Sequence, residues 1–434
     1  MAIDNKDKKV LKSSIEREQN ELACSAEREK IKGSKNLNVP HLRFPEFTDE
    51  WKESVLSDFV ERVKRKNKNN LCKLPLTISA QYGLVDQISF FNKVIASENM
   101  SNYYLLHKGD FAYNKSYSSE YPWGAIKRLD CYEQGTLSSL YICFKPYSHV
   151  SSDFLTHYFE TSKWHQGISE IAVEGARNHG LLNVGIQDFF ETRHCLPQSL
   201  LEQEKIAKFL NLIEERIATQ NKIIEKYESL IQAIIYKTKM DGISKGTWRK
   251  IDLYEVLQER NEKNVEGRTI CSVSVSQGVV NQIEYLGRSF AAKQTSHYNV
   301  VKYGDIVYTK SPTGDFPYGI IKRSDIREDV AVSPLYGVYI PANDSMGVIL
   351  HFYFMQPCNA FNYLHPLIQK GAKNTINTSN GRFLENSVPL PVSESEANTI
   401  AVMLKSIQAK IEIEKKLLQL YAKEKEYLLH QMFI

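Results

Sequence analysis

Two lysine–serine pairs stand in a setting that suits contacts with nucleic acid. Lys115-Ser116 and Lys310-Ser311 each follow a short β-rich run that contains a tyrosine, and each enters a loop of hydroxyl and amide side chains. An aromatic-Pro-aromatic-Gly element closes both loops, and a Lys-Arg pair ends the next β-rich run. Lysine and arginine can anchor phosphates while hydroxyl and amide groups contact base edges. The pattern therefore indicates a DNA-binding surface.

Two further segments extend this prediction. The stretches EGARNHGLLN and KGAKNTINTS are rich in donors and acceptors, and a basic run begins at Lys64. The candidate DNA-binding residues are Lys64, Arg65, Tyr113, Lys115, Ser116, Lys127, Arg128, Arg177, Asn178, Tyr308, Lys310, Ser311, Thr313, Lys322, Arg323, Lys373 and Asn374. The competing interpretation is that Gly-Asp and Lys-Arg only cap strands and decorate the exterior.

Motifs of catalysis are missing from the sequence. It contains no G-x-x-x-x-G-K-[ST] phosphate loop, no G-x-G-x-x-G that opens a helix, and no H-E-x-x-H or G-x-S-x-G element. The 11 histidines lie singly, which favours packing roles over metal binding. We therefore expect no catalytic residues, no metal site and no cofactor bound by this chain.

The composition is that of a globular protein with a reduced interior. The 434 residues are enough for two to four domains, 42% are hydrophobic, and the net charge is only +4. No run of 18 apolar residues and no apolar leader occurs, so neither a membrane span nor a secretory signal is expected. The 7 cysteines form no C-x-x-C pair, which fits a reducing cytoplasm.

A tandem repeat decides the architecture. Residues 107–130 and 302–325 match without a gap at 11 of 24 positions, at an offset of 195. The match extends to the segments led by Trp51 and Trp248 and to the Leu-Pro pairs that end each copy. Copies of this size are whole domains, because solenoid units run to about 20–50 residues.

Each copy is followed by a heptad pattern. Its apolar positions alternate by four and three residues, which predicts a helix with a narrow seam, and a polar residue (Gln220 or Glu414) stands in the middle of each seam. The seam residues are Ile206, Leu210, Ile213, Ile217, Ile224, Tyr227 and Ile231 in the first helix, and Ile400, Leu404, Ile407, Ile411, Leu418, Tyr421 and Leu428 in the second. The pattern favours two helices paired antiparallel, and the alternative is that each packs only on its own domain.

The domains themselves read as mixed α/β (α+β). Short β-rich runs at 74–78, 110–113, 125–127, 139–144 and 305–308 are separated by turn residues, and helical patches lie at 154–164 and 348–355. The predicted organisation is a polar, disordered tail at 1–38, a first domain at 39–197, a first spacer helix at 198–241, a second domain at 242–391 and a second spacer helix at 392–434. Gly242 is the expected stop of the first helix.

These features together resemble a known family. The tandem copies, the segment FPEFTDEWKESVLSDF, the GD-x-x-Y-x-KS runs and the stretch LPQSLLEQEKIAKFL are similar to the DNA-specificity subunit of type I restriction–modification systems. The resemblance covers nearly the whole chain from Val39 onward. The second copy departs from it, because LPVSESEANTIAVML keeps only Glu396 of the Glu-Gln pair.

The resemblance implies a non-catalytic subunit that acts with partners. Two target-recognition domains would each read one half of a bipartite, asymmetric site on double-stranded DNA, and an antiparallel helical spacer would set the distance between them. The spacer would bind two methyltransferase subunits, and optionally two motor-nuclease subunits; S-adenosylmethionine, and ATP with Mg, would be bound by those partners. Two alternatives from other classes are a duplicated DNA-acting enzyme with a dispersed site and a coiled-coil interaction scaffold.

Overall fold

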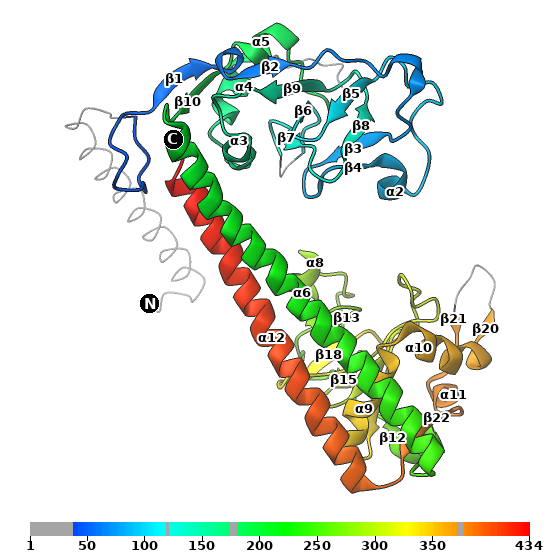
Figure 1. The fold of residues 1–434 in the computed structure, drawn as a ribbon. Coiled ribbons are helices and arrows are strands. Elements are labelled where there is room, and N and C mark those ends of the chain that lie inside the picture. The colour runs from blue at the N-terminus through cyan, green and yellow to red at the C-terminus, as the bar shows by residue number, and fades with distance from the viewer. Residues whose placement is uncertain (1–37, 119–120, 173–179, 371–375) are drawn as a thin grey trace, which may run out of the picture. The chain divides into compact units, whose positions relative to one another are not determined.

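The structure, a computed structural model, describes residues 38–118, 121–172, 180–370 and 376–434. It comprises two compact units: the first runs to Ile217 and also contains Leu420–Ile434, and the second is Ala218–Gln419. Two long helices, α6 (Leu200–Lys245) and α12 (Glu394–Gln431), contribute to both units (Figure 1). The predicted tail at 1–38 lies, except for its last residue, outside the described residues.

Unit 1 is built on a four-stranded sheet of order β2-β9-β6-β7, with β1 paired to β10, β3 to β4 and β5 to β8. Every one of these pairings is antiparallel. Its elements are β1 (Lys52–Val55), η1 (Leu56–Asp58), β2 (Val60–Arg62), η2 (Lys68–Asn70), β3 (Leu76–Ser79), β4 (Gly83–Asp86), α2 (Gln87–Phe91), β5 (Tyr104–His107), β6 (Phe111–Asn114), β7 (Ala125–Arg128), β8 (Gln134–Leu137), β9 (Ile142–Pro146), α3 (Ser152–Tyr158), α4 (His165–Ile171), α5 (Ile186–Phe190) and β10 (Arg193–Leu196).

Unit 2 repeats this topology. Its four-stranded sheet has the order β12-β19-β16-β17, and β11 pairs with β22, β13 with β14, β15 with β18, and β20 with β21, all antiparallel. Its elements are β11 (Trp248–Asp252), α7 (Leu253–Val256), β12 (Leu257–Glu259), β13 (Cys271–Ser274), β14 (Gly278–Asn281), α8 (Gln282–Leu286), β15 (Asn299–Val301), β16 (Ile306–Tyr308), β17 (Ile321–Arg323), β18 (Val330–Val332), β19 (Gly337–Pro341), α9 (Asp344–Phe354), α10 (Pro357–Leu364), η3 (His365–Leu367), β20 (Gln369–Lys370), β21 (Ile376–Asn377), α11 (Asn380–Phe383) and β22 (Ser387–Pro391).

Most of the predicted helix seam is buried in both units, and its remaining members, Ile217, Tyr227, Leu418 and Tyr421, are partly buried. In unit 1, Ile206 and Leu210 of α6 belong to one apolar core with Leu428 of α12. In unit 2, Ile231 of α6 shares a core with Leu404 of α12, so the helices run antiparallel within each unit. The same cores include the sheets and short helices of each domain. The helices therefore pack on each other and on a domain at once.

The two polar residues in mid-seam meet each other. The Gln220 side-chain amide donates to the carboxylate of Glu414 at 2.5 Å and to its carbonyl oxygen at 3.2 Å. Gln220 is buried, so a shifted helix register would leave its amide without a partner. This pair fixes the register of α6 against α12 within unit 2.

Each domain is joined to the first turn of a long helix by a tryptophan. The indole N–H of Trp51 donates to Glu202 at 3.1 Å in unit 1, and that of Trp248 donates to Glu396 at 2.8 Å in unit 2. In unit 1, Arg43 adds two hydrogen bonds to the Glu202 carboxylate, at 2.6 and 2.8 Å. The acidic first turns that the sequence showed are thus anchors for the domains.

The structure corrects two predicted boundaries. The expected stop at Gly242 is wrong: α6 continues to Lys245, and the chain turns at Gly246, whose φ is +72°. Gly242 is required for packing, because a Cβ there would lie 2.0 Å from Cδ1 of Trp248. Of the helical patch predicted at 154–164, only 154–158 is helical: α3 ends at Tyr158, the carbonyls of Tyr158 and Phe159 accept from the side chains of Thr161 and Trp164, and α4 begins at His165.

Candidate nucleic-acid interface

The Gly-Asp pairs of the repeat make turns. The Asp110 carboxylate accepts the backbone N–H of His107 at 2.8 Å, and that of Asp305 accepts the N–H of Lys302 at 2.8 Å. The glycine before each aspartate has a φ of +90°. The interpretation of Gly-Asp as a strand cap is therefore correct in both copies.

An arginine pairs with each of these aspartates. Arg65 contacts Asp110 in unit 1, and Arg260 Nε lies 2.6 Å from Asp305 Oδ2 in unit 2. Burial raises the pKa of the Asp110 carboxyl, and the Arg65 charge opposes that shift. Arg65, predicted as a DNA contact, thus already has a structural partner, although its side chain is 37% exposed.

The tyrosines of the repeat belong to the core. Tyr113 and Tyr308 are 0% exposed, and their hydroxyls donate at 2.9 Å to the carbonyls of Trp123 and Tyr318, which lie in the aromatic-Pro-aromatic-Gly turns. Burial raises the pKa of both phenols. We therefore remove Tyr113 and Tyr308 from the candidate interface, because their only polar atom closes a turn.

The Lys-Arg pairs are bound within the domains as well. Lys127 Nζ lies 2.5 Å from Glu160, and Arg128 pairs with Asp130 and Asp153 at 2.6 Å each. Lys127 and Arg128 therefore have carboxylate partners, where the sequence suggested free charges.

In unit 2 the equivalent pair is buried. Lys322 and Arg323 are each 3% exposed, and Arg323 contacts Asp325 and Asp344. Burial lowers the pKa of Lys322 to about 8. Lys322 and Arg323 are therefore also removed from the candidate interface, because both side chains are buried inside the domain.

The Lys-Ser loop of unit 1 lies beside the end of the second predicted loop. The backbone N–H of Leu182 donates to the Lys115 carbonyl at 2.9 Å, Ser116 forms a β-bridge with Leu181, and the N–H of Tyr117 donates to Gly180 at 3.1 Å. The side chains of Ser116 and Tyr117 are exposed. Two segments that are about 65 residues apart in sequence thus form one surface.

The same juxtaposition occurs in unit 2 through side chains. Lys310 Nζ donates to Asn380 Oδ1 at 2.9 Å, and the Asn380 amide donates to Glu259 at 2.7 Å. These three residues, with Ser379, line an open hollow of about 600 Å³. Ser311 and Thr313 are exposed in the adjoining loop. The hollow therefore offers one cation, one carboxylate and one amide to a ligand.

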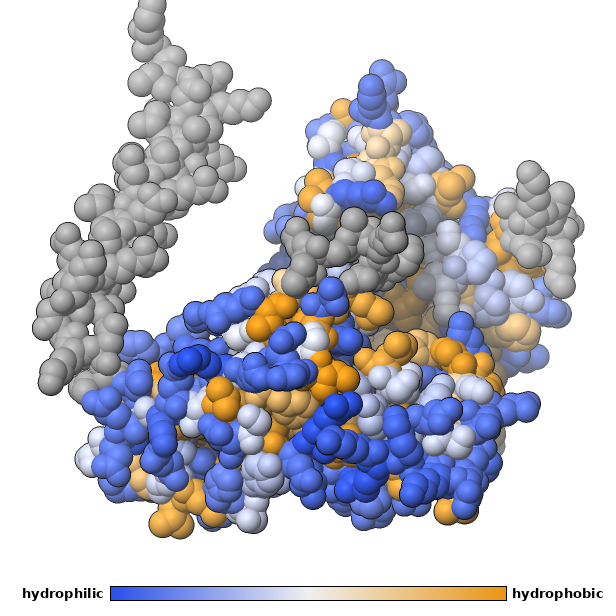
Figure 2. Space-filling view, turned by 90° about the horizontal axis from the view of Figure 1, so that it is seen from above, coloured by the Kyte–Doolittle hydropathy of each residue, from blue (hydrophilic) through white to orange (hydrophobic). Residues whose placement is uncertain are grey.

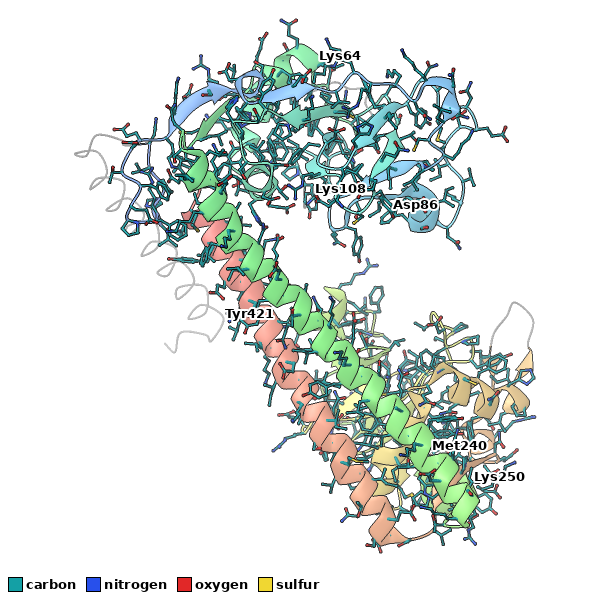
Figure 3. All side chains as sticks on the ribbon, viewed as in Figure 1. Lys64, Asp86, Lys108, Met240, Lys250 and Tyr421 are labelled. Atoms are coloured by element: carbon teal, nitrogen blue, oxygen red, sulfur yellow. The ribbon has the colours of Figure 1, made fainter. Side chains whose placement is uncertain are left out.

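A second hollow lies in unit 1 at the predicted basic run. It has a volume of about 360 Å³ and is lined by Glu61, Arg62, Val63, Lys64, Arg65 and Lys145. Lys64 is exposed (Figure 3), and Lys145 is paired with Glu61 at 3.1 Å. The hollow is basic overall, which suits a phosphate. Four of the predicted residues, Arg177, Asn178, Lys373 and Asn374, lie outside the described residues.

Sequence reasoning missed three residues that the structure brings to these sites. Glu259 and Asn380 join Lys310, and Lys145 joins Lys64. Alignment of the copies on Trp51 and Trp248 gave one usable signal, because it places Arg62 opposite Glu259. Such a reversal of charge at a matching position marks a place where the two domains differ in chemistry.

The fold is similar to those of solved type I restriction–modification proteins. The S subunit from M. genitalium matches with a TM-score of 0.53 and 14% sequence identity, over 91% of this chain and 99% of that chain. The HsdS subunit from Thermoanaerobacter tengcongensis gives a TM-score of 0.36 and 15% identity, over 88% and 96% of the two chains. A structure described for complex assembly of the type I R-M system gives 0.43 and 14%, over 91% and 99%. The first of these shows that the chain has the fold of an S subunit, which confirms the predicted fold class.

Other comparisons found no relatives. No protein-family model matches the chain, and no curated protein is similar to it at a significant level. Among the described residues, no group of three or more His, Cys, Asp and Glu is placed to hold a metal ion. Within that same part of the chain, no helix has the length and apolar content needed to cross a membrane.

Proposed function

We propose that the chain is the sequence-specific DNA-binding subunit of a type I restriction–modification complex. Each domain reads one half of a bipartite, asymmetric site on double-stranded DNA. The observation that carries the proposal is the repeated site: in each unit the Lys-Ser loop, at Lys115 or Lys310, lies against the end of the second predicted loop. Two similar domains with different side chains at this site suit two different half-site sequences.

The long helices set the spacing of the half-sites and bind partners. Within unit 1, Leu420 and Tyr427 are each 61% exposed and lie seven residues apart, on one face of α12. Within unit 2, Val402 and Ile413 are 60% and 63% exposed and lie three turns apart. Exposed apolar residues at helical spacing favour contact with another helix. The partners are two methyltransferase subunits and, optionally, two motor-nuclease subunits.

The outer surface of the helices differs from their seam. Figure 3 shows Tyr421 on α12, where its partly buried ring lies 5.2 Å from the guanidinium of Arg216. Figure 2 shows hydrophobic areas scattered among hydrophilic ones on the face in view. Ile413, an exposed apolar residue of α12 outside the seam, stands between Glu412 and Glu414 in the sequence and so has charged neighbours.

Catalysis belongs to the partners in this proposal. The chain itself binds DNA in the cytoplasm and holds no cofactor, whereas S-adenosylmethionine, and ATP with Mg, are bound by the methyltransferase and motor-nuclease subunits. The chain alone is expected to neither methylate nor cleave DNA.

The test is methylation mapping of genomic DNA with and without this gene, in cells that supply the methyltransferase partner. A bipartite methylated motif that depends on the gene is the expected result. Lys115→Ala should weaken binding of the purified complex and reduce its salt slope by about one unit, because one phosphate contact is lost. Lys250→Ala, at an exposed lysine of β11, is the matched control and should leave both unchanged. If deletion of the gene removes no methylated motif, the proposal is contradicted.

A further inference from the structure

The hollow beside Lys310 holds a chain of three polar side chains. The amide nitrogen of Asn380 donates to Glu259 at 2.7 Å, while its amide oxygen accepts from Lys310 at 2.9 Å. A lysine can only donate and a carboxylate can only accept, so these partners fix which way the amide faces. The Asn380 amide thus holds a positive and a negative group at a set separation.

This set of three side chains is supported by the sheet and helix α11 of unit 2. Glu259 ends β12 and pairs with Tyr339 of β19, whose hydroxyl donates to the Asn380 carbonyl at 3.0 Å. The ring of Tyr339 is buried and stacks on Phe383 of α11 at 4.6 Å. A recognition site needs such support, because a displacement of about 1 Å can weaken its contacts.

The three side chains retain hydrogen-bonding capacity toward the hollow. Lys310 has two further N–H groups, Asn380 one further amide hydrogen and Glu259 a second carboxylate oxygen. Burial lowers the pKa of Lys310, which the Glu259 charge partly opposes, so desolvation acts on this lysine. Lys115, its counterpart, has no side-chain hydrogen bond or ion pair within the described part of the chain.

Unit 1 has different chemistry at the matching positions. Arg62 stands opposite Glu259, at the same place in the four-stranded sheet, and Ile186 stands opposite Asn380, at the start of the helix that stacks on the core tyrosine. The lysine is kept in both copies, whereas its two partners are not. In unit 2 the two partners hold the lysine beside a carboxylate, so Lys310 can contact a base, whereas Lys115 lacks these neighbours and suits a phosphate.

We propose that Glu259, Asn380 and Lys310 form a base-reading cluster of the second domain and that it selects a G·C pair. Lys310 donates to O6 or N7 of guanine, Glu259 accepts from the N4 amino group of the paired cytosine, and Asn380 positions both. If an A·T pair replaces this G·C pair with the purine in the same place, adenine presents its N6 amino donor to the lysine and thymine presents its O4 acceptor to the carboxylate. Both contacts are then mismatched, so the cluster rejects an A·T pair. This inference rests on the proposed function and deepens it.

The experiment uses the full chain co-purified with its methyltransferase partner. The bipartite motif of the parent complex is first mapped by methylation of a library randomised in both half-sites. Glu259→Gln keeps the shape and a hydrogen bond to Asn380 but removes the acceptor-only charge. It should relax discrimination about tenfold or more at one G·C position of the second half-site and nowhere else. Lys115→Met is the matched control and should leave that position unchanged.

Two further variants separate base contact from structural support. Lys310→Met should reduce discrimination at the same G·C position while leaving the salt slope as in the parent, since no phosphate contact is lost. Asn380→Ala should relax the same position more weakly, as expected of a positioning residue. A uniform loss of affinity over all sequences, or a second half-site with no required G·C pair, would overturn the inference. A parent complex that recognises no bipartite site would instead contradict the proposed function, and the inference with it.

Discussion

The two units use the same contacts to build their frames and different contacts around their loops. The pair of Trp51 with Glu202 recurs as Trp248 with Glu396, and the bond from Tyr113 to Trp123 recurs as that from Tyr308 to Tyr318. Around the loop lysines, in contrast, the matching positions differ. Arg62 and Ile186 of unit 1 correspond to Glu259 and Asn380 of unit 2. Residues that are identical in both copies mainly hold the fold, and the proposed base-reading cluster combines a shared lysine with two partners that unit 1 lacks.

The helices allow the strongest test of this division. A heptad inserted into α6 near Gln220, together with one inserted into α12 near Glu414, preserves both seams. The two domains should then recognise their half-sites about three base pairs farther apart, because seven residues add about 10.5 Å. A heptad in α6 alone shifts the Gln220–Glu414 register and should reduce specific binding by at least about 100-fold. Methylation mapping of the complex reports both outcomes. If the spacing of the half-sites is unchanged with both insertions, the helices do not set that spacing.

The two helix anchors should differ in strength. Glu202→Ala leaves Arg43 and Trp51 without their partner in unit 1 and should cost about 3–5 kcal/mol, since a buried charge loses its counterion. Glu396→Ala leaves only Trp248 and the more exposed Thr247 unpaired and should cost about 1–2 kcal/mol. Denaturant unfolding followed by hydrogen exchange in each unit measures both. Equal costs would show that the Arg43 contact adds nothing to the first anchor.

The Lys-Arg pairs predict a pH dependence in unit 2. Burial lowers the pKa of Lys322 from 10.5 to about 8, so between these values the unfolded chain keeps a proton that the folded unit releases. The free energy of unfolding should therefore rise with pH across this window, by at most about 3 kcal/mol. Lys322→Met should remove the rise and stabilise the unit at pH 7.

Unit 1 supplies the control for that experiment. Lys127, the counterpart of Lys322, pairs with Glu160 at 2.5 Å, and its replacement by methionine should destabilise the unit slightly. Opposite signs for the two substitutions at pH 7 are the expected result. The same sign for both would show that the ion pair with Glu160 does not distinguish the two lysines.

The smallest expected effects are those at the core tyrosines. Tyr113→Phe and Tyr308→Phe each remove one buried hydrogen bond to a turn carbonyl and should cost about 1 kcal/mol, equally in the two units. The methylated motif should stay unchanged, because neither hydroxyl reaches the surface. A changed half-site in either variant would return that tyrosine to the interface.

Much of the fold was predictable because its signals are periodic. The heptads placed Ile206 and Leu428 at buried positions, and the repeat placed two similar domains before two long helices. The stop at Gly242 failed because glycine signals either a helix end or a close approach, and here the Trp248 ring requires the second. A tertiary contact of this kind leaves no local mark in the sequence.

The site was less predictable than the fold. The repeat located the Lys115 and Lys310 loops, but the same repeat also included Tyr113 and Arg323, which are buried. Identity between the copies cannot separate a side chain that holds a turn from one that faces solvent. Asn380 became recognisable only through its bonds to Glu259 and Lys310, which lie 121 and 70 residues away in sequence.

Unit 1 is assembled from two segments that lie far apart in the sequence, and this has a consequence for its synthesis. Its core joins Trp51 and Phe154 to Phe433, with ring centroids 6.3 and 5.3 Å apart, so it contains chain made before and after all of Ala218–Gln419. A ribosome that adds about 5–20 residues per second needs roughly 10–40 s for the intervening segment. During that interval the aromatic face around Trp51 stays uncovered on the nascent chain, while unit 2 can close as soon as its own residues have emerged. The first domain to be translated is therefore the last to be completed.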